Sequence, residues 1–279
     1  MSKVFLRFYS VILCFPVVVS LWIADLNAFE YKDQLINNQS LHYQHYNILE
    51  KKITGFSVIT TESVLLEGKR LILELSQNKK PDGKVFSERK IYFEPESGRL
   101  VRYQETDFRS ELHVTDLFEE TKIKTEVKKG ELAKSFSIEI EKGLVPFETI
   151  TLAFQKEIKR LLKEKELPFL LYLPALAFEL EKVGLPPSLS KLQMTAQIEK
   201  LDQFDTPLGQ KKAVWIIARP VSVLIRSLLP KEKTEFRFVF MTEKPNYLLM
   251  FEENNTQSVL KEIKLEKGEP ELKPLTGAL

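Results

Sequence analysis

The feature that most constrains this fold is a long series of strand-like segments joined by short turns. Between residues 41 and 140 these segments recur about every 10–13 residues. The intervals leave no room for the crossover helices that parallel strands need. The spacing therefore predicts an antiparallel meander rather than alternating β-α units.

Alternation within the segments predicts a sheet with two unlike faces. Leu71, Leu73 and Leu75 alternate with other residues after the turn Glu67-Gly68, which indicates a hairpin. Most segments carry apolar residues on one face and charged residues on the other, the pattern of an antiparallel sheet with one solvated side. A sheet of about seven or more strands twists and curls.

The apolar period changes after Pro146. In the stretch 147–166, Phe154, Ile158 and Leu161 belong to a set of apolar residues at three- and four-residue steps. This period predicts an amphipathic helix. The next stretch, 169–184, is apolar nearly all round and contains Pro174, so we expect a kinked helix or two short helical pieces.

Strand character then returns for the remainder of the chain. We expect strands over 191–201, 211–221, 235–243, 247–253 and 258–266. The stretch 222–230 is ambiguous and allows a short helix. Residues 267–279 mix Pro, Gly and balanced charge without a period, which predicts a flexible tail.

The first 28 residues have the layout of a secretory signal peptide. Lys3 and Arg7 supply a basic start, residues 8–23 are almost wholly apolar, and Ala28 offers a small residue for cleavage. We therefore expect an exported, periplasmic protein that contacts the membrane only through this peptide or transiently. One continuous β-rich domain then covers 29–266, with a helical insert at about 146–184.

Two other interpretations of the N-terminus fit less well. An uncleaved anchor needs roughly 20 apolar residues, whereas this run has about 16 and contains Pro16. Lipidation at Cys14 is disfavoured because Leu13 is too large for the processing site and Cys14 lies deep inside the apolar run.

Charge and cysteine content exclude several classes of function. Removal of residues 1–28 takes away Lys3, Arg7 and Asp25, and leaves 39 basic and 38 acidic side chains. This balance predicts no strong electrostatic attraction to nucleic acid or to anionic lipid, and we expect no nucleic-acid partner. Cys14 is the only cysteine, so the cleaved chain has no disulfide, thiol nucleophile or thiolate metal site. A chain of about 250 residues buries enough core without disulfides.

Candidate catalytic and metal-binding residues carry little signal. His42 and His45 are three apart on an expected strand and point to opposite faces, so they cannot share one ion, and His113 is distant in sequence. Glu94 and Glu96 flank a proline in a solvated turn. The lysines of the expected helix are interleaved with glutamates. We predict no metal, no cofactor and no catalytic motif.

The apolar segment 169–178 exceeds what one helix face can hide. It either fills the concave side of the curled sheet as core, or it forms one wall or a lid of an apolar cleft. Burial of each large side chain stabilises by about 1.5–3 kcal/mol, so the segment needs a covering partner. If a cleft exists, the candidate ligand-binding residues are Tyr172, Leu173, Phe178 and Trp215.

The chain resembles a bacterial family of exported proteins, the domain-of-unknown-function family numbered 3108. The likeness rests on RKIYFEPESGRLVRY (89–103), on the turn 206–209 before a strand with Trp215, and on EFRFVFMTEKPNYLLMFE (235–252). It covers most of residues 45–265. The resemblance implies a curved antiparallel sheet or half-barrel around helices, in the periplasm, and brings no known active-site residues.

These observations predict a mainly β (α+β) fold: a curved antiparallel sheet or half-barrel with the helical insert packed on its concave side. The first functional hypothesis is a non-enzymatic envelope protein that binds an apolar or amphiphilic ligand such as a lipid. The second is a structural or assembly module that binds another envelope protein through a strand edge or the tail. The third is an enzyme whose site has no recognisable motif, which converging polar side chains in a deep pocket would favour.

Overall fold

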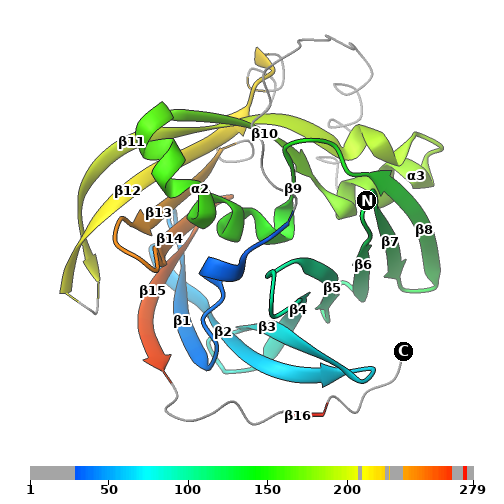
Figure 1. Cartoon of the computed structure of the whole chain (residues 1–279), viewed down its shortest axis with the longest axis horizontal. Coiled ribbons are helices and arrows are strands. Elements are labelled where there is room, and N and C mark those ends of the chain that lie inside the picture. The colour runs from blue at the N-terminus through cyan, green and yellow to red at the C-terminus, as the bar shows by residue number, and fades with distance from the viewer. Residues whose placement is uncertain (1–28, 207–208, 224–225, 227–234, 266–272, 275–279) are drawn as a thin grey trace.

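A single long sheet bends round a central helix in the computed structural model (Figure 1). The structure describes residues 29–206, 209–223, 226, 235–265 and 273–274. The expected signal peptide, most of the ambiguous stretch 222–230 and nearly all of the expected tail lie outside these residues. In the described part of the chain, no helix has the length and apolar character required to cross a bilayer.

The first half of the sheet is a meander of neighbouring hairpins. Its strands are β1 (Gln39–Asn47), β2 (Lys52–Leu66), β3 (Lys69–Lys79), β4 (Val85–Phe93), β5 (Leu100–Asp107), β6 (Leu112–Phe118), β7 (Lys122–Lys129) and β8 (Leu132–Glu139). A short 3-10 helix, η1 (Lys32–Gln34), precedes them. Each of these strands overlaps a segment that the sequence predicted as a strand.

The second half contains the helices and the remaining strands. Its strands are β9 (Leu144–Pro146), β10 (Glu166–Tyr172), β11 (Lys191–Thr206), β12 (Gly209–Pro220), β13 (Phe236–Met241), β14 (Leu248–Glu253), β15 (Thr256–Leu265) and β16 (Lys273–Pro274). Its helices are η2 (Phe147–Thr149), α2 (Ile150–Glu164), α3 (Pro174–Lys182) and η3 (Pro187–Ser190).

The spatial order joins the two halves at one seam. From one end the order is β8 to β1 in reverse sequence, then β15 to β9. The seam pairs β1 with β15, and it places His45 opposite Ser258, 213 residues further along the chain. Every neighbouring pair on this path is antiparallel except β9 with β10. The predicted curved antiparallel sheet with a helix on its concave side is confirmed.

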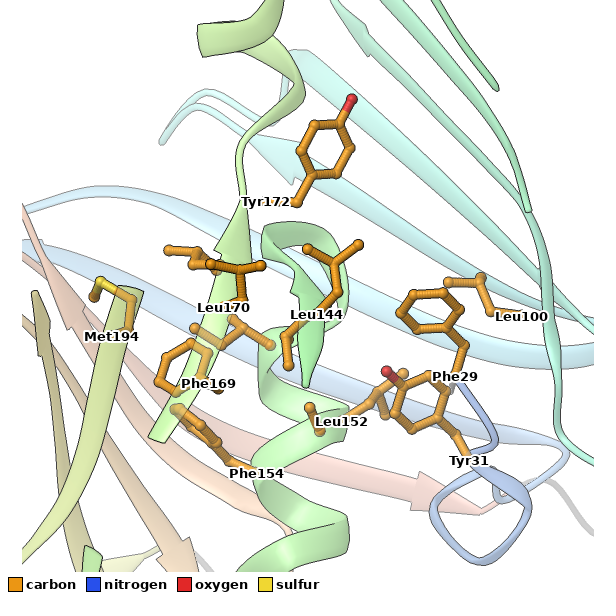
Figure 2. Close-up of a cluster of buried hydrophobic side chains, with 14 of the residues drawn as sticks. Phe29, Tyr31, Leu100, Leu144, Leu152, Phe154, Phe169, Leu170, Tyr172 and Met194 are labelled. Atoms are coloured by element: carbon orange, nitrogen blue, oxygen red, sulfur yellow. The ribbon is translucent and has the colours of Figure 1, made fainter. Parts of the chain in front are cut away.

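Helix α2 packs its apolar face against the inner side of the sheet. Its buried residues recur at helical spacing and are Ile150, Leu152, Ala153, Phe154, Ile158 and Leu161. The Phe154 ring meets Phe169 of β10 and Phe238 of β13 edge-on, with centroids 5.3 and 4.9 Å apart. Figure 2 shows side chains from the helix, β10 and the N-terminal segment in one continuous core.

Helix α3 lies between the two ends of the open sheet (Figure 1). Its inner face is apolar and buries Phe178. Its outer residues form ion pairs with the last strands of the first half: Lys129 to Glu179 at 3.8 Å and Lys134 to Glu181 at 3.2 Å. Exposed pairs of this kind contribute little stability, so the apolar face holds α3 in place.

Two expectations need correction. Residues 169–172 form the end of strand β10, not a helix, and only 174–182 are helical within the stretch 169–184. β10 pairs with β11 over its whole length, and this long-range pairing overrides a local pattern that fits either structure. The sheet also extends further than predicted at 204–210, where β11 reaches Thr206 and β12 begins at Gly209.

The polar side of β3 faces inward. Leu71 and Leu73 belong to a small cluster with Val64 and Tyr92 that is separate from the main core, whereas Ile72 joins the main core with α2. In this part of the sheet the alternating leucines therefore lie on the outer face. The alternation identified the two faces but did not indicate which one was inside.

Truncation of the helix's central aromatic should be costly. Phe154 is 1 % exposed and loses two ring contacts in Phe154→Ala, so we expect the free energy of unfolding to fall by about 3–5 kcal/mol. Lys159→Ala, on the exposed side of the same helix, should change it by less than about 0.5 kcal/mol. Urea denaturation measures both; equal effects would show that α2 is not the centre of the core.

Candidate ligand-binding cleft

A cleft of about 780 Å³ opens on the inner side of the sheet. Strands β1 to β5 form one wall, and β14 with the start of β15 forms a second. The segment η2–α2 closes it from the centre of the molecule. Its lining includes Tyr43, His45, Ser57, Glu74, Ser76, Asn78, Lys80, Phe86, Ser87, Arg89, Glu105, Asp107, Arg109, Phe147, Glu148, Ile150, Thr151, Leu248, Phe251, Glu253 and Ser258.

Strand register organises the wall into rows of directly opposed residues. One row places Ser57 opposite Asn78, and Asn78 opposite Ser87. The next row, two residues along each strand, places Ser76 opposite Arg89, and Arg89 opposite Glu105. Because side chains two apart on a strand share a face, both rows project into the cleft.

The first row is a hydrogen-bonded chain that crosses five strands. His45 Nδ1 lies 2.6 Å from Ser258 Oγ, and its Nε2 contacts Ser57 Oγ. Ser57 Oγ donates to Asn78 Oδ1, and Asn78 Nδ2 donates to Ser87 Oγ over 2.8 Å. Since the Ser57 proton goes to Asn78, Nε2 of His45 must carry the proton that bonds Ser57. The Ser258 hydroxyl then donates to Nδ1, and all donors point the same way.

Burial and the positive charge of Arg89 lower the pKa of His45 to about 4. The imidazole is therefore neutral at pH 7, as the orientation of the row requires. Gly55 lies beside it, opposite His45 in the strand register. A Cβ there would come 2.4 Å from the carbonyl oxygen of Lys79, so only glycine allows this close approach of β2 to β3.

The second row contains polar atoms that no protein group satisfies. Among the described residues, Arg89 forms no hydrogen bond and has no carboxylate oxygen within 4.0 Å. Its buried Nε is unpartnered, and so are Ser76 Oγ beside it and Glu148 Oε2 on η2. Buried polar groups are nearly always hydrogen-bonded. The contrast with the fully paired first row marks this part of the cleft as the candidate site.

Carboxyl groups surround Arg89 without touching it. Burial raises the pKa of Glu74 to about 7, partly offset by Arg89. Burial, Asp116 and Glu105 raise the pKa of Glu148 well above its ordinary value. The Glu105 carboxylate accepts a 2.6 Å hydrogen bond from Tyr103. Burial opposes the charge of Arg89, but Tyr103 and the nearby glutamates together raise its pKa.

A cluster of buried polar side chains leads from Glu148 into the core. Thr125 Oγ1 donates to Asp116 Oδ1 over 2.6 Å and lies 2.9 Å from the Tyr172 hydroxyl. Asp116 is 0 % exposed, and its second oxygen has no partner. Burial raises the pKa of Asp116 to about 7, the Thr125 bond opposes this shift, and Glu105 adds to it.

Apolar side chains complete the cleft. Phe147 and Ile150 line it from η2 and α2, and Leu248 and Phe251 line it from β14. At the mouth, the Arg109 guanidinium lies 4.2 Å from the Phe86 ring centroid and pairs with Asp107 at 2.9 Å. The cleft thus presents an apolar side to one part of a ligand and unpaired polar groups to another.

The four candidate residues from the sequence do not line this cleft. Tyr172 and Phe178 are buried in the main core, and Leu173 packs against it from the start of α3. Trp215 belongs to a second cluster, where it contacts Phe204 and lies 4.3 Å from Lys200 Nζ. The structure does not bring all four together, and their role in ligand binding stays a prediction.

The sequence analysis missed Glu74, Arg89, Glu105 and Glu148. A signal existed for three of them, because each occupies the polar side of a predicted strand next to apolar residues of the same face, as Glu74 does after Ile72. Glu148 follows Pro146 at the start of the helical segment and carried no comparable signal. His45 was considered only as a metal ligand and set aside, although its predicted strand is confirmed. The described residues include no group of three or more side chains arranged to hold a metal ion.

Comparisons with known proteins give two similar structures. One is a protein described as exported, with a YmcC-like fold, from Bacteroides fragilis: 9% identity, coverage of 85% of this chain and 99% of that chain, and a TM-score of 0.34. The other is described as a lipoprotein from Parabacteroides distasonis: 10% identity, coverage of 85% and 100%, and a TM-score of 0.32. No family model and no curated protein matches the chain. At these TM-scores the likenesses carry no functional argument, and the resemblance to family 3108 stays a prediction.

The first row can be broken by one substitution. Asn78→Leu removes the partner of both Ser57 and Ser87, so we expect a loss of about 1–3 kcal/mol in the free energy of unfolding. Gln77→Leu, one position away, removes only a 3.0 Å bond to Glu88 on the other face of the strand and should cost under about 1 kcal/mol. Chemical denaturation distinguishes them; equal costs would mean that the row contributes no special stability.

Glu74 should make stability depend on pH. Its pKa of about 7 in the folded chain lies above the ordinary 4.5, so the unfolded chain ionises first as pH rises. Stability is therefore fully present below pH 4.5 and is lost as pH rises toward 7. The change in the free energy of unfolding caused by Glu74→Gln should therefore be about 1–2 kcal/mol more favourable at pH 8 than at pH 4.5. This figure is reduced from the full pKa shift to allow for solvent in the cleft.

Denaturation at pH 4.5, 6 and 8 measures this effect. Glu88→Gln is the control on the outer face of β4. Burial would raise the pKa of Glu88, but hydrogen bonds from Gln77 and Lys90 hold it below its ordinary value, so its influence lies below pH 4.5. Titration of His45 contributes the same pH dependence of stability to the variants and to the natural chain, so it cancels in the comparison. Parallel pH profiles for Glu74→Gln and the natural chain would refute the assignment.

Proposed function

We propose that this protein is an exported envelope protein that binds one amphiphilic ligand in the inner cleft without chemical conversion. The observation that carries the proposal is the pairing of apolar side chains with unsatisfied polar atoms in one cleft. Its volume of about 780 Å³ lies in the range of small-molecule sites, which run from roughly 300 to 1,000 Å³. The signal-peptide pattern of residues 1–28 supports export to the periplasm.

The mixed lining argues for an amphiphile over a purely apolar ligand. An apolar ligand would cover Ser76, Arg89 and Glu148 and leave their buried polar atoms without partners, which costs about 1–3 kcal/mol for each group. A fully polar ligand would gain nothing from Phe147, Ile150 and Phe251. A molecule with one apolar and one polar end satisfies both sides.

A filled cleft should no longer bind. Thr151 on α2 lines the cleft, so the indole of Thr151→Trp should occupy ligand space and lower affinity for the neutral probe N-phenyl-1-naphthylamine at least about tenfold, a loss of about 1.4 kcal/mol. Lys159→Trp adds the same side chain on the exposed face of α2 and should leave affinity unchanged. Fluorescence titration of the cleaved chain measures both. Equal affinities would place the probe elsewhere, and Tyr172, Leu173, Phe178 and Trp215 would be the next residues to test.

Native mass spectrometry of protein purified from an exporting host adds an independent test. The proposal expects a bound amphiphile that organic extraction releases and that Thr151→Trp lacks. A natural chain that carries no such molecule and binds no probe would contradict the proposal.

A second candidate function is acid–base catalysis. It is favoured by the carboxyl group of Glu74, which lines the cleft and whose pKa of about 7 suits a general acid near neutral pH. A ligand recovered in chemically altered form, with the change lost in Glu74→Gln, would favour the enzyme. The assembly hypothesis, binding of another envelope protein through a strand edge or the tail, stays an alternative.

A further inference from the structure

We propose that the polar end of the ligand is an anion, a carboxylate or a phosphate, and that the Arg89 guanidinium binds it. The inference rests on the proposed function and names the chemical class of the ligand. It follows from three properties of Arg89: its place in the cleft, its lack of a protein partner and the state of the acids around it.

The position of Arg89 suits recognition rather than structural support. The side chain extends from the middle of β4 into the cleft between Ser76 and Glu105. Ser76 offers an unpartnered hydroxyl beside it. A guanidinium presents donors in a planar fork that matches the two oxygens of a carboxylate or phosphate.

Other arginines of the same sheet show how a structural arginine is satisfied here. Arg237 pairs with Glu252 at 3.1 Å, and Arg219 Nη2 donates to Gln197 over 2.6 Å even though the Nε of Arg219 has no partner. Arg102 on the neighbouring strand pairs with Glu67 at 3.5 Å. Arg89 has no such partner among the described residues. An unpaired charge inside a protein is costly, and a bound anion supplies the missing partner.

The acids near Arg89 do not provide a substitute for that anion. Burial raises the pKa of Glu148 well above its ordinary value and that of Glu74 to about 7, which shifts both carboxyl groups toward the protonated form that can donate a hydrogen bond to a ligand oxygen. Glu105 is engaged by Tyr103. The other titratable or charged residues that line the cleft are Tyr43, His45, Lys80, Asp107, Arg109 and Glu253. Burial lowers the pKa of His45 and raises the pKa of Tyr43 and of Glu253, so these three groups are shifted toward their neutral forms. Arg109 pairs with Asp107 at 2.9 Å, and Lys80 directly follows β3.

The test compares head groups on one chain length. Dodecanoate, dodecyl phosphate, dodecan-1-ol and dodecylammonium are titrated into the full cleaved chain below their micelle concentrations, by competition with N-phenyl-1-naphthylamine. We expect the two anions to bind about 10- to 100-fold more tightly than the alcohol. Arg89→Met should remove that advantage and leave the affinity for the alcohol unchanged.

Controls separate this inference from folding and from the proposed function. Arg102→Met removes the same side chain from the outer face of β5 and should alter no affinity. Arg89→Lys keeps the charge but lacks the planar fork, so it should lose part of the preference for anions. This variant replaces Arg89→Met in the test if circular dichroism shows that Arg89→Met does not fold. Failure of every dodecyl compound to bind would contradict the proposed function itself, whereas alcohol binding that Thr151→Trp abolishes would support it.

Four results would overturn the anion assignment while the cleft still binds the alcohol. They are equal affinity for alcohol and anions, tightest binding of dodecylammonium, an unchanged anion preference in Arg89→Met, and the same loss in Arg102→Met. Titration with inorganic phosphate alone distinguishes the source of the anion. If inorganic phosphate bound as tightly as dodecyl phosphate, the cleft would recognise a free anion, and the proposal of an amphiphilic ligand would be overturned.

Discussion

Packing of the apolar face of α2 against the inner side of the curved sheet holds this molecule together. A sheet this long has an inner surface too wide for its own side chains to cover. The side chains of Phe154, Ile158 and Leu161 pack against this surface and fill the space that it encloses. Because η2 leads directly into α2, the same packing positions Glu148 and Thr151 over the strands and gives the cleft its inner boundary.

The cleft exists because the inner face of β3 to β5 changes character along the strands. At one end the inward positions are apolar and join the core, as Ile72 and Phe93 do. At the other end they carry Glu74, Arg89 and Glu105. No core residue can pack against that charged half without leaving polar groups unpaired. The gradient along a strand therefore becomes a gradient across the cleft, which has an apolar and a polar end.

Local patterns in the sequence were sufficient for the architecture and insufficient for the site. The three- and four-residue spacing of Ile150, Phe154 and Ile158 predicted α2, and alternation with short turns predicted the meander. The stretch 169–172 was assigned to a helix because a short apolar run fits both structures, and only its pairing with β11 decides between them. Likewise, Leu71 and Leu73 indicated a strand with one apolar face. That face lies on the outside of the sheet, where the two leucines pack in a separate cluster, and the polar face lies inside.

Arg89 could be assigned to a strand from the sequence, but not to a site. Its importance depends on the absence of a partner, and partners are set by register between strands and by the position of η2. Glu148 reaches the same cleft from a segment 59 residues further along the chain, counted from Arg89. Nothing in either local sequence predicts that they converge, because convergence follows from the curvature of the whole sheet.

The seam between β1 and β15 has a consequence for how the molecule assembles. Each half of the sheet grows by adding the next strand in sequence, but the seam unites the first long strand with the last one on the path. Contacts between such distant residues are slow to form, because closing a long loop costs chain entropy before the new contacts contribute any stability. Walls from both halves border the cleft, so a partly synthesised chain lacks the complete cleft. The complete cleft is thus a property of the finished molecule, because it requires the pairing of β1 with β15.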